Sequence, residues 1–493
     1  MSNDLCPCPT CDRRAGILLH PTSLPGGVGN GDIGFEAHRF VEFLASAGMT
    51  AWQMLPIAPT HGDLSPYTAL SVHAGNPSLI SLRWLENRGW LLPEEAAIDD
   101  VSAYRQRRLI TAREGFLAHA TEMDRNAYEQ FRLKHDHWLV DYALFESIRR
   151  HQGCRHWLAW PESLRDREPA ALREAQVKLF HETEQTCFEQ FVFFLQWREL
   201  HDHARHHGVK LFGDVPIFVA HDSAEVWCHR EYFTLDEHGN AQTVAGVPPD
   251  YFSETGQRWG NPHYRWDRME ADGFKWWKQR FATQLEMFDW LRIDHFRGFE
   301  AFWEIPAHEE TAINGRWVKA PGDALFSALQ ETFDSLPLVA EDLGIITEEV
   351  DALREKYGLP GMKILQFAFD GDATNPYLPH NHTLDSVVYT GTHDNNTTQG
   401  WYDELDDGQK SRIAEYYGNA AEKMPWLLIR SALASVSRLA MIPMQDILEL
   451  GSEERMNTPG VAQGNWQWRF DWSQVDEGLA VRLKRLLELY GRR

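Results

Sequence analysis

The chain has 493 residues, a mass of 56.9 kDa and a net charge of −24. Hydrophobic residues make up 43% of it and charged residues 24%, which is close to the globular average and excludes a mainly disordered chain or a fibre. The excess of 72 acidic over 48 basic side chains repels phosphate groups, so neither nucleic acid nor an anionic membrane is an expected partner.

Neither secretion nor membrane insertion is expected from the sequence. The first 14 residues lack the apolar core of a signal peptide, and no run of about 18 apolar residues occurs anywhere. We therefore expect a cytoplasmic protein that does not enter the membrane.

Three of the six cysteines, Cys6, Cys8 and Cys11, lie close together near the start of the chain. Such a group could hold a soft metal, but the second CxxC or His-x-His pair that usually completes the site is missing nearby. The scattered remaining cysteines indicate no disulfide framework. We interpret residues 1–14 as a flexible tail and predict no metal site.

Eight short apolar runs, typical of buried parallel strands, recur along the chain. They lie at residues 16–20, 50–57, 210–215, 289–294, 336–342, 362–369, 386–390 and 440–444. Between most of them apolar residues recur every three or four positions, as on one face of a helix. These predicted helices lie at residues 35–47, 185–207, 277–288, 325–333, 347–357 and 426–439.

This alternation through eight strands favours a closed (β/α)₈ barrel, a TIM barrel of the α/β class, over an open doubly wound sheet. The connection at residues 371–384 contains Pro376 and Pro379 and has no clear helix, so one repeat is expected to be degenerate.

Three segments are expected to be insertions into a single catalytic barrel of residues 15–493. The first, residues 59–184, is too long for a loop and is rich in helix formers, which predicts a mainly helical subdomain after the second strand. The others are residues 235–273, expected to be a loop region, and residues 395–425.

Acidic residues follow four of the predicted strands: Asp214, Asp294, Glu341 and Asp394. The C-terminal strand ends of such a barrel form one mouth, where the chemistry takes place. Each acid alone is better explained as a helix cap or as one partner of a local ion pair. That explanation is less convincing for four acids that all follow strands at the same end of the barrel.

Asp294 and Glu341 are expected at matching heights on neighbouring strands, about 5 to 6 Å apart, which suits a retaining glycosidic mechanism. Arg292 lies on the same strand face as Asp294 and favours its ionised form. Glu341, among other carboxylates, should have a raised pKa, as a general acid requires. The 20 Trp residues also fit a sugar ligand, because flat rings stack on pyranose faces, although most should lie in the core.

From residue 15 to the end, the sequence resembles the amylomaltases, which are 4-α-glucanotransferases also called disproportionating enzymes and are related to the α-amylases. Eight blocks in the family's order carry the resemblance. They are LLHPTSLPGGVGNGDIG (18–34), SPYTALSVHAGNP (65–77), GDVPIFVAHDSAEVW (213–227), AGVPPDYFSETGQRWGNP (245–262), RIDHFRGF (292–299), VAEDLG (339–344), THDNNT (392–397) and RMNTPG (455–460).

The resemblance implies a role for each of the acids. Asp294 would be the nucleophile that forms a covalent glucosyl-enzyme intermediate, and Glu341 would be the general acid and base. Asp394 would hold the distorted donor ring through its hydroxyl groups. The other residues that the resemblance places on the donor subsite are Asp214, Arg292, His295 and His393.

The resemblance further implies a loop over the site at residues 246–256, with Asp250, Tyr251 and nearby Trp259 facing the glucan, and Tyr67 contacting it further out. Such a loop could shield the intermediate from water. Residues 60–65 and Arg258 depart from the family's usual pattern, which bears on the acceptor side.

The predicted activity is transfer of α-1,4-glucan segments between maltooligosaccharides, with retention. The alternative is an α-glucan hydrolase, and a third reading is a glucan-binding protein without activity. Because no nucleotide loop, metal motif or Schiff-base pattern occurs, we predict no cofactor. The acidic surface is compatible with a monomer or a dimer.

Overall fold

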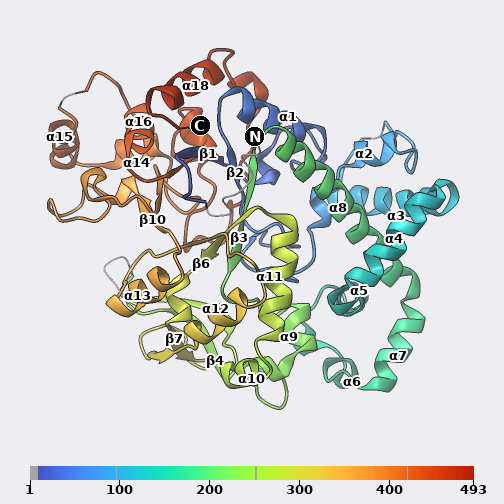
Figure 1. Ribbon diagram of the computed structural model, residues 1–493. Helices are drawn as coiled ribbons and strands as arrows, with labels where there is room; N and C mark the ends of the chain where they lie inside the picture. The colour runs from blue at the N-terminus through green and yellow to red at the C-terminus, as the bar shows by residue number, and fades with distance from the viewer. Residues whose placement is uncertain (1–8, 96, 250–252, 419, 493) are drawn as a thin grey trace.

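The computed structural model describes residues 9–95, 97–249, 253–418 and 420–492. Eight parallel strands form its central sheet (Figure 1). They are β1 (Arg14–Leu18), β2 (Ala51–Gln53), β3 (Lys210–Pro216), β6 (Trp290–Asp294), β9 (Leu338–Ala340), β10 (Gly361–Ile364), β11 (Ser386–Tyr389) and β12 (Leu439–Pro443).

The strands pair in the order β10-β11-β12-β1-β2-β3-β6-β9, which is the chain order of a barrel. Between β9 and β10, the Ala340 amide donates to the Pro360 carbonyl at 2.9 Å, so the sheet nearly closes on itself. Apolar side chains such as Phe212, Trp290 and Met441 are buried together in one cluster contributed by the strands. The predicted (β/α)₈ barrel is confirmed.

Helices surround these strands in Figure 1. They include α1 (Phe35–Ser46), α8 (Phe180–His206), α11 (Lys275–Met287), α12 (Gly322–Gln330), α13 (Glu348–Lys356), α16 (Trp426–Ala434), α17 (Met444–Ile447) and α18 (Leu479–Leu489). The segment before β11 has only a 3₁₀ turn, at Pro379–Asn381, as the two prolines predicted. No helix of the described residues is both long enough and apolar enough to cross a membrane.

Three predicted strands are longer than the observed ones by four residues or more, and the one predicted at 336–342 is only Leu338–Ala340. The second ends at Gln53 rather than residue 57, because Pro56 has no backbone N–H with which to continue a ladder. The sixth ends at Ile364 rather than residue 369, and a 3₁₀ turn at Leu365–Phe367 replaces its end.

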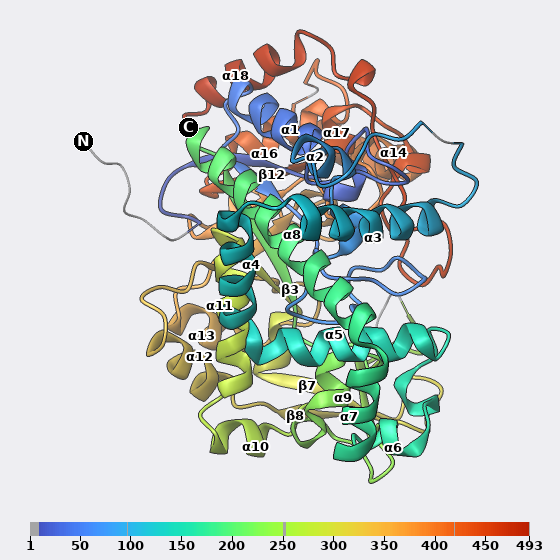
Figure 2. The ribbon, with the colours of Figure 1, turned by 90° about the vertical axis from the view of Figure 1, so that its right-hand side faces the viewer.

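The long insertion after β2 is mainly helical, as predicted, and lies on one side of the barrel (Figure 2). It holds α2 (Leu82–Asn87), α3 (Val101–His119), α4 (Glu122–Lys134), α5 (Asp136–His151), α6 (Glu162–Arg165) and α7 (Pro169–Lys178). The start of α4 is set locally, since Thr121 and Asp124 form a reciprocal capping box.

A second, antiparallel sheet has no counterpart among the predicted elements. It has the order β5-β4-β7-β8 and consists of β4 (Thr243–Val247), β5 (Gln257–Pro262), β7 (Ala301–Pro306) and β8 (Arg316–Lys319). The expectation of a loop region at 235–273 is therefore wrong for β4 and β5. Because β5 is mostly exposed and contains Gly260 and Pro262, its sequence lacks the alternation that reveals a strand.

Four further helices lie outside the barrel ring: α9 (Ala224–Cys228), α10 (Trp266–Ala271), α14 (Thr398–Glu404) and α15 (Asp407–Tyr416). The last two form most of the ordered structure in the predicted insertion at 395–425.

The start of the chain is only partly described. Cys6 and Cys8 lie outside the described residues. The expectation of a flexible tail is wrong for the residues that lead into β1, since Thr10 is buried and Arg438 donates to the carbonyls of Thr10 and Cys11 at 3.0 and 2.8 Å. Cys11 is disulfide-bonded.

Two arginines fasten the barrel where β12 meets β1. Arg492, which follows α18, is 1% exposed. Its guanidinium donates to six backbone carbonyls, those of Arg14, Ala432, Leu433, Ser435, Ser437 and Arg438, at 2.7 to 3.1 Å. Arg13 donates to Ser435 and Tyr490 carbonyls beside it. Arg13 also donates to the carbonyls of Leu433 and Ser437, and the Arg14 amide donates to that of Arg438, so the two arginines share this group of carbonyls.

We expect Arg492→Ala to lower the free energy of unfolding by about 3 kcal/mol, because it removes a buried guanidinium that donates to six backbone carbonyls. Urea unfolding followed by tryptophan fluorescence measures the effect. The matched control is Arg485→Ala on the exposed face of α18, which should change stability by less than about 0.5 kcal/mol. Equal losses in the two variants would contradict the fastening role.

Candidate active site at the carboxyl ends of the strands

Asp294 is the last residue of β6, and Arg292 lies two residues earlier on the same face of the strand. The register between β3 and β6 places Asp214 opposite Arg292. The Arg292 guanidinium donates to Oδ2 of Asp214 at 2.7 Å and to Oδ1 of Asp294 at 2.9 Å. One buried cation therefore holds two predicted carboxylates from neighbouring strands.

Burial and charge act in opposite directions on this group. Burial lowers the pKa of Arg292, but the charges of Asp214 and Asp294 outweigh it and hold that pKa well above its usual value. Burial raises the pKa of Asp214, while Arg292 and a 2.8 Å hydrogen bond from the Tyr67 hydroxyl oppose the rise. Asp294 is more open than Asp214, with 28% of its side chain exposed against 1%.

Glu341 follows β9 directly, and the parallel register of β6 and β9 places it level with Asp294. Its two carboxylate oxygens accept hydrogen bonds from the backbone amides of His295, at 2.6 Å, and Leu343, at 3.1 Å. Two amides from different strand ends thus fix the orientation of the carboxyl group.

Burial raises the pKa of Glu341 to about 8. The negative charge of Asp294 adds to this rise, whereas Arg292 and the His295 amide oppose it. Glu341 is therefore protonated at neutral pH, while its neighbour Asp294 is paired with a cation. The predicted separation of these carboxyl groups, about 5 to 6 Å, stays a prediction.

His295 has a left-handed backbone, with φ of 54°, which is uncommon for a residue with a Cβ atom. This turn directs its amide at Glu341. Its ring makes an edge contact with Trp259, with 4.9 Å between ring centres. Burial lowers the pKa of His295 to about 4, so the ring is neutral at neutral pH. Trp259 comes from β5, so the small sheet borders the site.

Asp394 follows β11 on a loop and has 48% of its side chain exposed. Asn457 donates to its Oδ1 at 2.7 Å, and Arg455 donates to its backbone carbonyl at 2.9 Å. His393 Nε2 lies 3.3 Å from the same carboxylate. Burial lowers the pKa of His393. The segment after β12 therefore positions an acid that belongs to the loop after β11.

Aromatic rings connect the two sides of the site. The ring of Tyr67 is stacked on His393, with 5.2 Å between centres, and Trp466 lies 6.0 Å from each of them. Tyr67 and Asp214 also line one hollow together with Phe218. Tyr67 thus touches both the Arg292 group and the Asp394 side.

Of the ten predicted site residues, nine lie in the described part of the chain, and Asp250 lies outside it, as does Tyr251. The sequence reasoning assigned no role to Asn457 and Arg455. Both residues stand in the block RMNTPG, so the resemblance could have pointed to them. Nothing in that block, however, indicates that it contacts the loop that carries Asp394.

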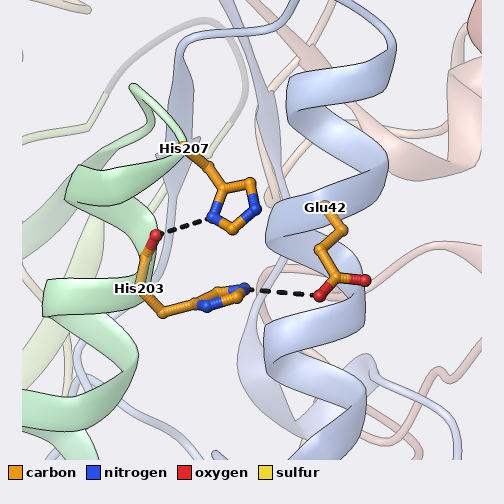
Figure 3. Close-up of side chains that lie close together, drawn as sticks. All are labelled: Glu42, His203 and His207. Carbon is orange, nitrogen blue, oxygen red and sulfur yellow. Dashed lines mark hydrogen bonds and ion pairs between the residues drawn. The ribbon is translucent and has the colours of Figure 1, made fainter.

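The described residues contain one group of three His, Cys, Asp or Glu side chains close enough to share a metal ion, and it is not at this mouth. It consists of Glu42, His203 and His207 on α1 and at the end of α8 (Figure 3). The mouth instead offers two level carboxyl groups in different surroundings. Such a pair can act as nucleophile and acid in glycosidic-bond chemistry.

Several known proteins are similar to this chain in sequence and in fold. A profile for the family described as 4-alpha-glucanotransferase matches residues 19–474. The 4-alpha-glucanotransferase of Thermus thermophilus is 50% identical over 492 residues, which cover 97% of this chain and 98% of the relative. That of Synechocystis is 46% identical over 496 residues, which cover 98% of each chain.

Solved structures of amylomaltases have a similar fold. An amylomaltase from Streptococcus agalactiae, in complex with acarbose, superposes with a TM-score of 0.93 at 36% identity and covers 97% of this chain and 99% of that one. An amylomaltase from Corynebacterium glutamicum has a TM-score of 0.77 at 17% identity, covers 98% of this chain and 75% of that one, and supports the fold alone. From the profile match and these identities, the chain belongs to the 4-alpha-glucanotransferase family.

Proposed function

We propose that the protein transfers α-1,4-glucan segments from a donor maltooligosaccharide to the 4-hydroxyl group of an acceptor sugar. The observation that carries this proposal is the difference between two level carboxyl groups: Asp294 is paired with Arg292, and Glu341 is buried with a raised pKa. Family membership favours transfer over the alternative of glucan hydrolysis.

In the first half-reaction, the carboxylate of Asp294 attacks the anomeric carbon of the donor. The bond from that carbon to the glycosidic oxygen breaks, and protonated Glu341 gives its proton to the departing oxygen. The products are a covalent glucosyl-Asp294 ester and a shortened glucan. Arg292 holds the attacking carboxylate in place through the ion pair at 2.9 Å.

In the second half-reaction, Glu341 is ionised and removes the proton of the acceptor hydroxyl as that oxygen attacks the ester. The new glycosidic bond has the original anomeric configuration, and Asp294 leaves as a carboxylate. Water can replace the acceptor in the same geometry, so transfer depends on keeping water away from the ester. Trp259 on β5, whose ring contacts that of His295, would cover that side.

The remaining residues would hold the donor sugar. Asp394, fixed by Asn457, would bind hydroxyl groups of the distorted ring, and the binding would strengthen in the transition state. Among the described residues, Oδ1 of Asp214 and Nε2 of His295 are buried without a hydrogen bond. Since such atoms are costly when unpaired, we infer that they bind sugar hydroxyl groups. Asp250 and Tyr67 would add contacts further out.

The expected partners are maltooligosaccharides and α-1,4-glucans, and a monomer or dimer stays a prediction. So does a cytoplasmic location, since the potato and Arabidopsis thaliana relatives are named as chloroplastic or amyloplastic enzymes.

Incubation of the purified protein with maltotriose should produce glucose together with a ladder of longer and shorter glucans. Chromatography of the products, with the total of reducing ends followed in parallel, tests this. Transfer leaves the number of reducing ends unchanged, whereas hydrolysis raises it. Glucose and maltose without longer products would show that the protein is a hydrolase.

The pH dependence should follow the proton on Glu341. Because this group must be protonated to act as an acid, kcat/KM for maltotriose as donor should fall as the pH rises through about 8. A glycosyl fluoride donor supplies the control, since fluoride leaves without a proton. The alkaline fall should be absent for that donor, and its persistence would mean that another group titrates.

Substitutions should separate the two carboxyl groups. We expect Asp294→Ala to lose roughly 10⁴-fold or more in activity, and Glu341→Ala roughly 10² to 10⁴-fold with maltotriose. With azide and an α-glycosyl fluoride, Glu341→Ala should give the α-glycosyl azide, because Asp294 still forms the ester. Recovery of the same α-azide from Asp294→Ala would remove Asp294 from the nucleophile's role.

A further inference from the structure

Two helices far from the catalytic carboxylates bring a pair of histidines against a glutamate. His203 and His207 are four residues apart, so they lie on one face at the end of α8. That face packs against α1, and the carboxylate of Glu42 on α1 points toward the His203 ring (Figure 3). One ligand atom from each of these three residues lies within 4.8 Å of the other two.

The distance between His203 and Glu42 is unusual for a hydrogen bond or a tight ion pair. Nε2 of His203 is buried, makes no hydrogen bond among the described residues, and lies 3.6 Å from Oε1 of Glu42. Two ligand atoms on one tetrahedral Zn²⁺ ion are about 3.3 to 3.4 Å apart, given metal distances of about 2.0 to 2.1 Å. The gap therefore fits two ligands that share an ion.

The other ring is already oriented as a ligand would be. Nδ1 of His207 lies 2.9 Å from the His203 carbonyl, to which it can donate. That bond leaves Nε2 as the nitrogen with a free lone pair, and Figure 3 shows it pointing toward Glu42. A bond from the second ring nitrogen to a backbone carbonyl is the usual support of a metal-binding histidine.

A further histidine ring, that of His38, lies beside these three residues. His38 lies one turn before Glu42 on α1, with its ring centre 4.7 Å from that of His203. Glu42 itself is 59% exposed on its side chain, so an ion can enter from solvent.

We propose that Glu42, His203 and His207 form a binding site for a transition-metal ion, with zinc as the best match. Two imidazole nitrogens and one carboxylate oxygen suit Zn²⁺, whose fourth position would be filled by water. The ion would link α1 to α8 on the outside of the barrel. Because the three ligands belong to α1 and α8 and not to the strand ends that carry the catalytic carboxylates, we expect the ion to have a structural role.

Full-length protein freed of metal with a chelator should bind one equivalent of Zn²⁺, measured in competition with a chromogenic zinc chelator. Co²⁺ as a probe should give the visible absorption bands of a four-coordinate site. The unfolding temperature should rise with zinc concentration, because the ion binds the folded state. Transfer activity should be the same with and without the ion.

Three variants and one matched control decide the matter. His203→Ala and His207→Ala should each weaken Zn²⁺ binding by roughly 100-fold or more, and Glu42→Gln by roughly tenfold. His206→Ala removes a neighbouring exposed histidine and should leave the affinity unchanged. Circular dichroism confirms that each variant is folded. The proposal would be overturned if the protein bound no zinc at micromolar concentration. It would also be overturned if His203→Ala and Glu42→Gln bound zinc as tightly as the unchanged protein, because cysteines would then hold the ion.

Discussion

The guanidinium of Arg292 is the constraint around which the catalytic mouth is arranged. It is 6% exposed and binds Asp214 and Asp294 at once, so its charge is compensated from two strands. Removing either carboxylate would leave this buried cation with one partner fewer, so the position of Asp294 depends on the same ion-pair group that links β3 to β6. The nucleophile is thus held in place by the pairing of these two strands.

Glu341 shows how a second carboxyl group can be kept protonated within reach of that cation. It stands level with Asp294, but burial and the charge of Asp294 together outweigh the attraction of Arg292. Its orientation comes from the backbone amides of His295 and Leu343, and the first of these depends on a left-handed turn at His295. Strained backbone of this kind persists only where its surroundings hold it, here in the edge contact with Trp259.

Much of this arrangement could be predicted because parallel strands end at one edge. Given the strand positions, Asp214, Asp294 and Glu341 must come together, and the register confirms that they do. The small sheet could not be predicted, because β5 is exposed and interrupted by glycine and proline. The support of Asp394 by Asn457 could not be predicted either, since it depends on how two loops cross.

The cluster of Glu42, His203 and His207 likewise could be predicted only in part from the sequence. Two histidines four residues apart are visible as one helix face, but most such pairs are simply solvated. The third residue belongs to a helix on the other side of a strand and a long insertion, and only the packing of α1 on α8 brings it near. Sites at strand ends share a plane set by topology, whereas sites between helices depend on packing, so the second kind emerges only from the structure.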